Sequence, residues 1–141
     1  MEETSLYPHY SAVNRLKALL GSEAVITDEE AIAFTTRNTS AFDPPQVPGL
    51  VVPENVQELR DVLSLAREYQ MQVYPYSRGL NWGLGSRLPA SEDCILVSLE
   101  KLNNIREVNE QYHYAIIEPG VTQQQLAAYL KAQGYALQLN V

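Results

Sequence analysis

Residues 75–85 read Pro75-Tyr76-Ser77-Arg78-Gly79-Leu80-Asn81-Trp82-Gly83-Leu84-Gly85. This stretch follows a short apolar run and places three glycines and a serine in one predicted loop. Glycine is used where the backbone adopts a positive φ or approaches a partner closely, and the N–H groups of such a loop can face a bound anion. The loop is therefore a candidate phosphate-binding loop, while an ordinary tight turn whose glycines only satisfy local geometry explains the same pattern.

The spacing of the glycines excludes two common nucleotide-binding motifs. Glycines at positions 79, 83 and 85 do not match Gly-x-Gly-x-x-Gly, and no Gly-Lys-Ser/Thr follows them as a P-loop requires. A second candidate, Glu118-Pro119-Gly120-Val121-Thr122, lies between a predicted strand and a predicted helix. The free N–H groups of a helix N-terminus suit an anion or a polar ring edge, and a plain strand-to-helix turn is the alternative.

Composition limits the partners of the chain. Its 141 residues are 45% hydrophobic, which is typical of one globular domain. A net charge of -7 with scattered Lys and Arg leaves no basic surface for nucleic acid or an anionic membrane, so a bound anion must be held locally. The single cysteine, Cys94, excludes a disulfide within the chain. Because no apolar run approaches the roughly 20 residues of a membrane span and the N-terminus lacks a secretory pattern, we expect a cytoplasmic protein.

Hydrophobic periodicity predicts the elements of the first half of the chain. An amphipathic helix over residues 11–20 precedes a shorter helix that begins with a capping box of Thr27 and Glu30. After a proline-containing loop, residues 50–52 form a buried strand, Asn55 and Glu58 open a helix that runs to residue 69, and residues 73–76 form the next strand. This order predicts parallel strands joined by a crossover helix.

The second half of the chain is predicted to contain a strand, a hairpin and a helix. Residues 94–99 form the strand, and residues 105–108 and 114–118 pair antiparallel across a polar tip. A capping box of Thr122 and Gln125 begins a helix that ends at Gly134. Residues 135–141 then read as a final apolar strand.

The order of these pieces resembles the FAD-binding (PCMH-type) domain of the vanillyl-alcohol oxidase and p-cresol methylhydroxylase flavoproteins. The resemblance covers residues 45–141 and is carried by the helix over 55–69, the loop 73–85, a hairpin at Leu99–Val108 and the segment Glu118–Thr122. It implies an α+β fold in two parts: a first subdomain with a small parallel β unit flanked by helices, and the beginning of a second, antiparallel subdomain. Residues 1–44 would be an N-terminal helical lead-in.

The resemblance implies FAD as the cofactor and assigns residues to it. The first loop would wrap the FAD pyrophosphate with backbone amides, and the second segment would line the cofactor near its flavin end. Relatives that attach FAD through a histidine of this loop carry that histidine where this chain has Asn81, which argues against covalent attachment here. The expected cofactor-binding residues are Pro75, Tyr76, Ser77, Arg78, Gly79, Leu80, Asn81, Gly83 and Gly85 in the loop, with Glu118, Pro119, Gly120 and Val121 in the second segment.

The resemblance also implies a function and its limits. The chain would be the N-terminal FAD-binding part of an FAD-linked oxidase or dehydrogenase, in which hydride passes from a phenolic or alcohol C–H to the flavin. In that family later segments complete the cofactor site and carry the catalytic cap, so we expect no catalytic residue here, no turnover, and weak or absent FAD binding. The alternative is a non-catalytic interaction module or split-protein subunit, because an apolar strand at residues 135–141 would invite self-association or a second subunit.

Overall fold

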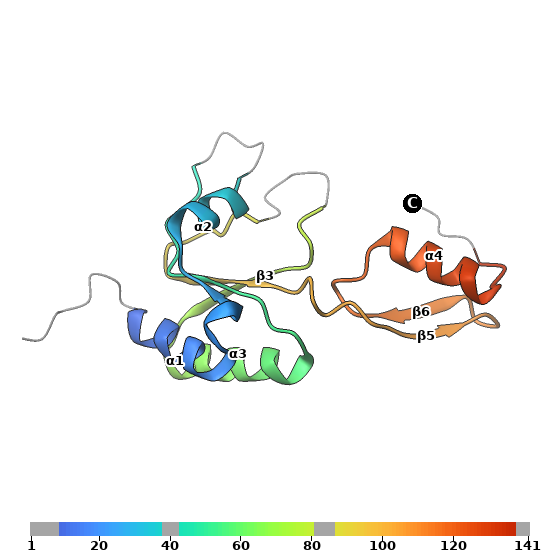
Figure 1. The fold of residues 1–141 in the computed structure, drawn as a ribbon, viewed down its shortest axis with the longest axis horizontal. Helices are drawn as coiled ribbons and strands as arrows, with labels where there is room; N and C mark the ends of the chain where they lie inside the picture. Colours follow the sequence, from blue (N-terminus) through green and yellow to red (C-terminus); the bar gives the residue numbers. More distant parts are fainter. Residues whose placement is uncertain (1–8, 38–42, 81–86, 138–141) are drawn as a thin grey trace, which may run out of the picture.

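The computed structural model describes residues 9–37, 43–80 and 87–137, which fold into two lobes (Figure 1). The first lobe holds a four-stranded sheet with three α-helices, and the second lobe holds a hairpin with one helix. In chain order the elements are α1 (Tyr10–Leu20), the 3-10 turn η1 (Ser22–Ala24), β1 (Val25–Ile26), α2 (Glu29–Thr35), β2 (Leu50–Val51), α3 (Val56–Glu68), β3 (Gln72–Tyr76), β4 (Cys94–Ser98), β5 (Ile105–Asn109), β6 (Tyr114–Ile117) and α4 (Gln123–Gln133).

The sheet of the first lobe has the strand order β1-β2-β4-β3. Strands β2 and β3 each pair parallel with β4, so the predicted parallel strand–helix–strand unit is present, with β4 inserted between its two strands. Strand β1, which periodicity did not reveal, pairs antiparallel with β2 at the edge. Every residue of β4 is buried, as expected for a central strand covered on both faces.

Two hydrophobic clusters cover opposite faces of this sheet. Because successive side chains of a strand point to opposite faces, Val51 and Val97 pack with α1 and α3, whereas Leu50 and Leu96 pack with Ile32 of α2. Figure 1 shows α1 and α3 together beneath the sheet and α2 on the other side. Helix α1 therefore shares one core with the sheet.

Helices α2 and α3 each begin where a side chain accepts a hydrogen bond from a backbone N–H three residues later. Asn55 caps α3 by accepting a hydrogen bond from the Glu58 backbone N–H at 2.9 Å, as predicted. The predicted capping box of α2 is wrong, because Asp28 accepts from the Ala31 N–H at 2.8 Å, and α2 begins at Glu29. Thr27 instead accepts a hydrogen bond from the Lys17 ammonium at 2.8 Å, which ties the segment before α2 to α1.

In the second lobe, β5 and β6 pair antiparallel and α4 follows them with the predicted capping box at Thr122. The hairpin that carried part of the resemblance was misplaced at Leu99–Val108: residues 99–104 connect β4 to β5, and these strands belong to different sheets. The predicted final strand is wrong for residues 135–137, which lie outside any strand. There the Ala136 N–H bonds to the Glu110 carboxylate at 3.1 Å rather than to a neighbouring strand, and residues 138–141 lie outside the described residues.

Candidate functional site

The two glycine-containing motifs meet beyond the carboxyl ends of parallel strands. The loop at residues 77–80 leaves the end of β3, and β4 ends beside it because the two strands are parallel and in register from Gln72 to Tyr76. Both strands end on the side of the sheet that faces the second lobe (Figure 1). Ligands of open parallel sheets bind at this kind of edge.

One side chain joins the motifs directly. The Arg78 Nη1 donates to the Gly120 carbonyl oxygen at 3.5 Å, across a sequence separation of 42 residues. Gly79 has φ +61°, the left-handed conformation that favours glycine. A left-handed residue lets a short loop turn, and the Arg78 contact places the loop next to the second segment.

Arg87 contributes to this site although the sequence analysis did not single it out. Its Nη2 donates to the Arg78 carbonyl oxygen at 2.7 Å, and its guanidinium carbon lies 5.7 Å from the centroid of the Tyr76 ring. Its Nε is buried and has no hydrogen-bond partner among the described residues. The only signal in the sequence is an isolated cation a few residues after a glycine run in an acidic chain.

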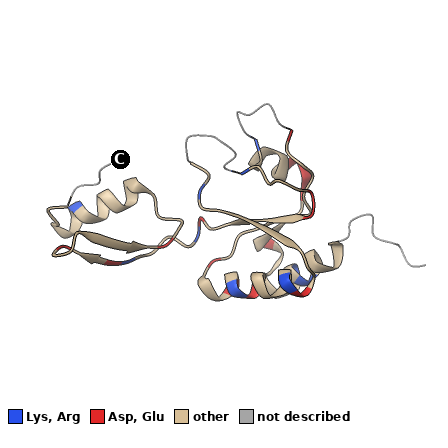
Figure 2. Ribbon diagram, turned by 180° about the vertical axis from the view of Figure 1, so that it is seen from behind, with Lys and Arg blue, Asp and Glu red and all other residues tan. Residues whose placement is uncertain are grey.

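Electrostatics at the loop differ from those of the whole chain. Despite the net charge of -7, both Arg78 and Arg87 bond to backbone oxygens at this site, and neither has a carboxylate within 4.0 Å in the part of the chain that the structure describes. Elsewhere basic and acidic residues are mixed along the helices beneath the sheet (Figure 2). Burial raises the pKa of the Tyr76 phenol, and the nearby Arg87 charge opposes that rise.

Glu118 serves the architecture of the second segment. Its side chain is only 6% exposed, and it accepts hydrogen bonds from the backbone and side-chain nitrogens of Asn104, both at 2.8 Å, and from Arg106. The Asn104 backbone N–H, with help from Arg106, lowers the pKa of the Glu118 carboxyl. The carboxylate therefore ties the segment to the start of β5.

Gly120 is required by close packing. A Cβ at this position would lie 2.5–2.7 Å from the carbonyl oxygens of Glu100, Leu99 and Leu102, and the Gly120 N–H donates to the Leu102 oxygen at 2.7 Å. The plain strand-to-helix turn thus accounts for this glycine. The segment therefore rests on the connection that leaves β4.

The other expected cofactor residues are distributed around this edge. Pro75 and Tyr76 belong to β3 itself, and Tyr76 pairs with Ser98 of β4. Within the loop Ser77 and Leu80 are exposed, and in the second segment Pro119 is exposed and Val121 half-buried. Asn81, Gly83 and Gly85 lie outside the described residues, so their expected roles stay predictions.

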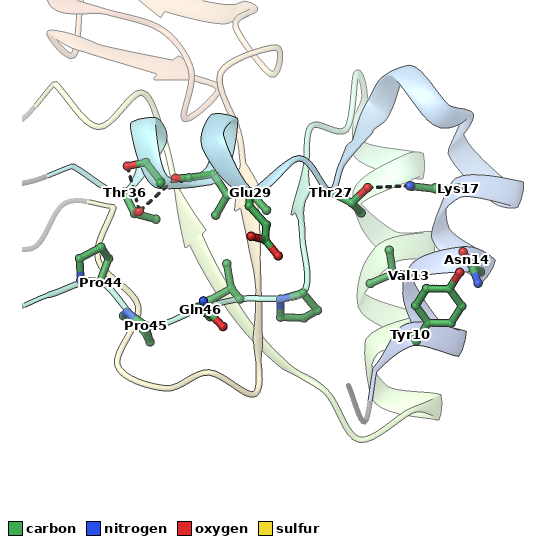
Figure 3. A pocket seen from close by; sticks show the side chains of 14 residues that line it. Tyr10, Val13, Asn14, Lys17, Thr27, Glu29, Thr36, Pro44, Pro45 and Gln46 are labelled. Atoms are coloured by element: carbon green, nitrogen blue, oxygen red, sulfur yellow. Dashed lines mark hydrogen bonds between the residues drawn. The ribbon is translucent and has the colours of Figure 1, made fainter. Parts of the chain in front are cut away.

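The described residues also form a cavity of about 510 Å³ between α1, α2 and the proline-containing segment before β2. Figure 3 shows Tyr10 and Lys17 on α1 facing Glu29 and the segment that includes Pro45. None of the expected cofactor residues that the structure describes lines it. None of the helices in the described ranges combines the length and apolarity needed to cross a membrane, and no group of three or more His, Cys, Asp or Glu side chains there is placed to hold a metal ion.

Comparison with known proteins gives relatives for this arrangement. The chain is 40% identical over 134 residues to 1'-carboxy-chondrochloren decarboxylase from Chondromyces crocatus, an alignment that covers 95% of the chain and 25% of that protein. It is 25% identical over 131 residues to the flavoprotein subunit of 4-cresol dehydrogenase (hydroxylating) from Pseudomonas putida, covering 92% of the chain and 25% of the subunit. The chain therefore spans about a quarter of the length of these relatives.

Solved structures share the fold. p-Cresol methylhydroxylase with substrate bound matches with a TM-score of 0.87 at 24% identity, covering 95% of this chain and 26% of that one. 4-Ethylphenol oxidase from Gulosibacter chungangensis matches with a TM-score of 0.84 at 23% identity, covering 98% and 27%. The expected mixed helix-and-sheet fold of a PCMH-type domain is thus confirmed. Residues 47–141 match the family described as FAD binding domain, and the chain therefore belongs to this family.

Proposed function

We propose that residues 45–141 supply the pyrophosphate-binding part of the FAD site of an FAD-linked oxidase or dehydrogenase. One observation carries the proposal: the Arg78 side chain joins the glycine loop to Gly120 at the carboxyl end of β3. Bound FAD would supply the hydride acceptor, and the residues of this chain would hold and orient it.

The residues at this edge suit a diphosphate. The backbone of residues 77–80 turns through the positive φ of Gly79, as a loop that directs N–H groups toward an anion does. Arg78 and Arg87 add positive charge that no carboxylate of the described residues neutralises. The buried Nε of Arg87 is a donor without an acceptor, and phosphate oxygens are good acceptors for guanidinium groups.

For the enzyme that contains this FAD site we propose oxidation of a phenolic or alcohol C–H. One named relative is a decarboxylase and another is a hydroxylating dehydrogenase. Nearly the whole of this chain aligns with both, 95% with the first and 92% with the second. A segment shared by proteins with different reactions is suited to bind their common cofactor. We therefore assign no catalytic residue to this chain and expect no turnover from it alone.

The test is a titration of FAD with the purified chain, followed by flavin absorbance and fluorescence. We expect weak binding of FAD and weaker binding of riboflavin, because riboflavin lacks the phosphates that the loop would hold. Absence of any spectral change at high micromolar protein would refute the proposal. Equal affinity for FAD and riboflavin would refute the role given to the loop.

A second candidate function is an interaction module. Strand β6 favours it, because Ile116 and Ile117 are 48% and 41% exposed and β6 pairs only with β5 among the described strands. An unpaired strand edge with apolar side chains is a site for pairing with another chain. Sedimentation velocity over a range of concentrations separates the candidates: a monomer throughout that binds FAD contradicts the interaction module.

A further inference from the structure

The position of Arg87 differs from that of an ordinary surface arginine. An ideal Cβ built on Gly79 would lie 2.0 Å from the Arg87 Nε and 2.8 Å from its Cδ, so the side chain lies directly on the backbone of Gly79. Its Nη2 donates a hydrogen bond to the carbonyl oxygen of Arg78, the residue that precedes Gly79, at 2.7 Å. Arg87 therefore packs against Gly79, which has a left-handed backbone.

This placement leaves the guanidinium incompletely satisfied. A guanidinium carries five N–H donors, and the described contacts of Arg87 are one hydrogen bond and the face of the Tyr76 ring. Its Nε is buried without an acceptor, and buried polar groups in folded proteins are nearly always paired. The unpaired Nε of Arg87 lies beside the loop at residues 77–80, so a hydrogen-bond acceptor bound at that loop could pair with it.

We propose that Arg87 is an anion-binding residue whose guanidinium binds a phosphate of the nucleotide held by residues 77–80. The inference rests on the proposed function and adds to it a side chain outside the expected cofactor set. Arginine suits this role because its planar fork matches phosphate geometry and stays charged at all relevant pH values. The atoms that contact Gly79 belong to the Arg87 side chain and not to backbone.

The role explains how an acidic chain would hold a pyrophosphate. Backbone N–H groups carry only partial charge, whereas the net charge of -7 repels an anion over distances up to about the 8–10 Å of a Debye length in physiological salt. A guanidinium at the loop opposes that repulsion locally. Tyr76 supports the guanidinium from one side through its ring face, which restricts the directions the cation can take.

The experiment compares the 141-residue chain with the variants Arg87→Gln, Arg87→Lys and Arg60→Gln. Arg60 is exposed on α3, so its variant makes the same change of charge away from the loop. Dissociation constants are measured for FAD and riboflavin by flavin fluorescence and for inorganic pyrophosphate by calorimetry, and circular dichroism checks that each variant folds. For Arg87→Gln we expect about 10- to 100-fold weaker binding of FAD and pyrophosphate, the size of a lost charge-assisted hydrogen bond, with riboflavin unchanged.

The other variants and outcomes separate this inference from the proposed function. Arg87→Lys should recover part of the affinity, since it keeps the charge and loses the fork, and Arg60→Gln should bind as the unmodified chain does. FAD binding by Arg87→Gln within twofold of the unmodified chain overturns the inference and leaves the FAD function standing. An equal loss for riboflavin also overturns it, because Arg87 would then only shape the loop. Pyrophosphate binding that depends on Arg87 without FAD binding upholds the inference and refutes the FAD function, and binding of neither refutes both.

Discussion

The substitution Gly120→Ala tests how the segment at Gly120 packs on the connection that leaves β4. The new methyl carbon would lie 2.5 Å from the Glu100 oxygen, 2.6 Å from the Leu99 oxygen and 2.7 Å from the Leu102 oxygen. Carbon atoms normally stay beyond 3 Å from such oxygens, and all three belong to backbone rather than to side chains that could rotate away. Overpacking typically costs 1–3 kcal/mol, so three simultaneous backbone contacts place the expected loss of stability near the upper end, at about 3 kcal/mol.

Urea unfolding followed by circular dichroism measures this loss, and Gly134→Ala is the matched control. Gly134 ends α4 with φ +75°, but a Cβ there would meet nothing within 4 Å. The control therefore isolates the strain of a left-handed alanine, about 1 kcal/mol. If Gly120→Ala destabilises the chain less than Gly134→Ala does, the packing explanation for Gly120 is wrong.

Three further predictions concern stability. Asn55→Ala should destabilise the chain by about 1 kcal/mol in urea unfolding because α3 loses its cap, whereas Asn55→Ser, which keeps a capping oxygen, should be nearly neutral. Leu96→Ala removes a fully buried side chain from the central strand and should cost about 2–5 kcal/mol; a loss below 1 kcal/mol would mean that the sheet collapses around the cavity. Because the pKa of Glu118 is lowered from its ordinary value of 4.5, its contribution is complete well above pH 4.5 and is lost as the pH falls through the lowered value. The stability difference between the unmodified chain and Glu118→Gln should therefore shrink in acid, and a difference independent of pH from 7 to 3 would contradict this.

Short-range patterns predicted most of the local structure. The cap at Asn55 and the capping box at Thr122 depend on side chains bonding to backbone a few residues away, so they were readable without tertiary information. The hairpin of β5 and β6 was likewise predicted from alternating residues around a polar tip. The predicted cap of α2 was wrong because Thr27 and Asp28 both suit an N-cap. In the structure Asp28 caps the helix, and Thr27 bonds to Lys17 on another helix.

The sequence by itself determined that the loop after β3 contains glycines, which a left-handed turn favours, and Gly79 adopts such a φ there. Only the tertiary structure decided what surrounds the loop. The insertion of β4 between β2 and β3 brings the segment at Gly120 to the end of β3, and Arg87 returns to lie on Gly79. The contact of Arg78 with Gly120 joins residues 42 apart in the chain, and its geometry depends on the order and register of the strands, which no local pattern encodes. The tertiary structure also shows that the glycine at position 120, a predicted ligand contact, packs against backbone oxygens of the connection that leaves β4.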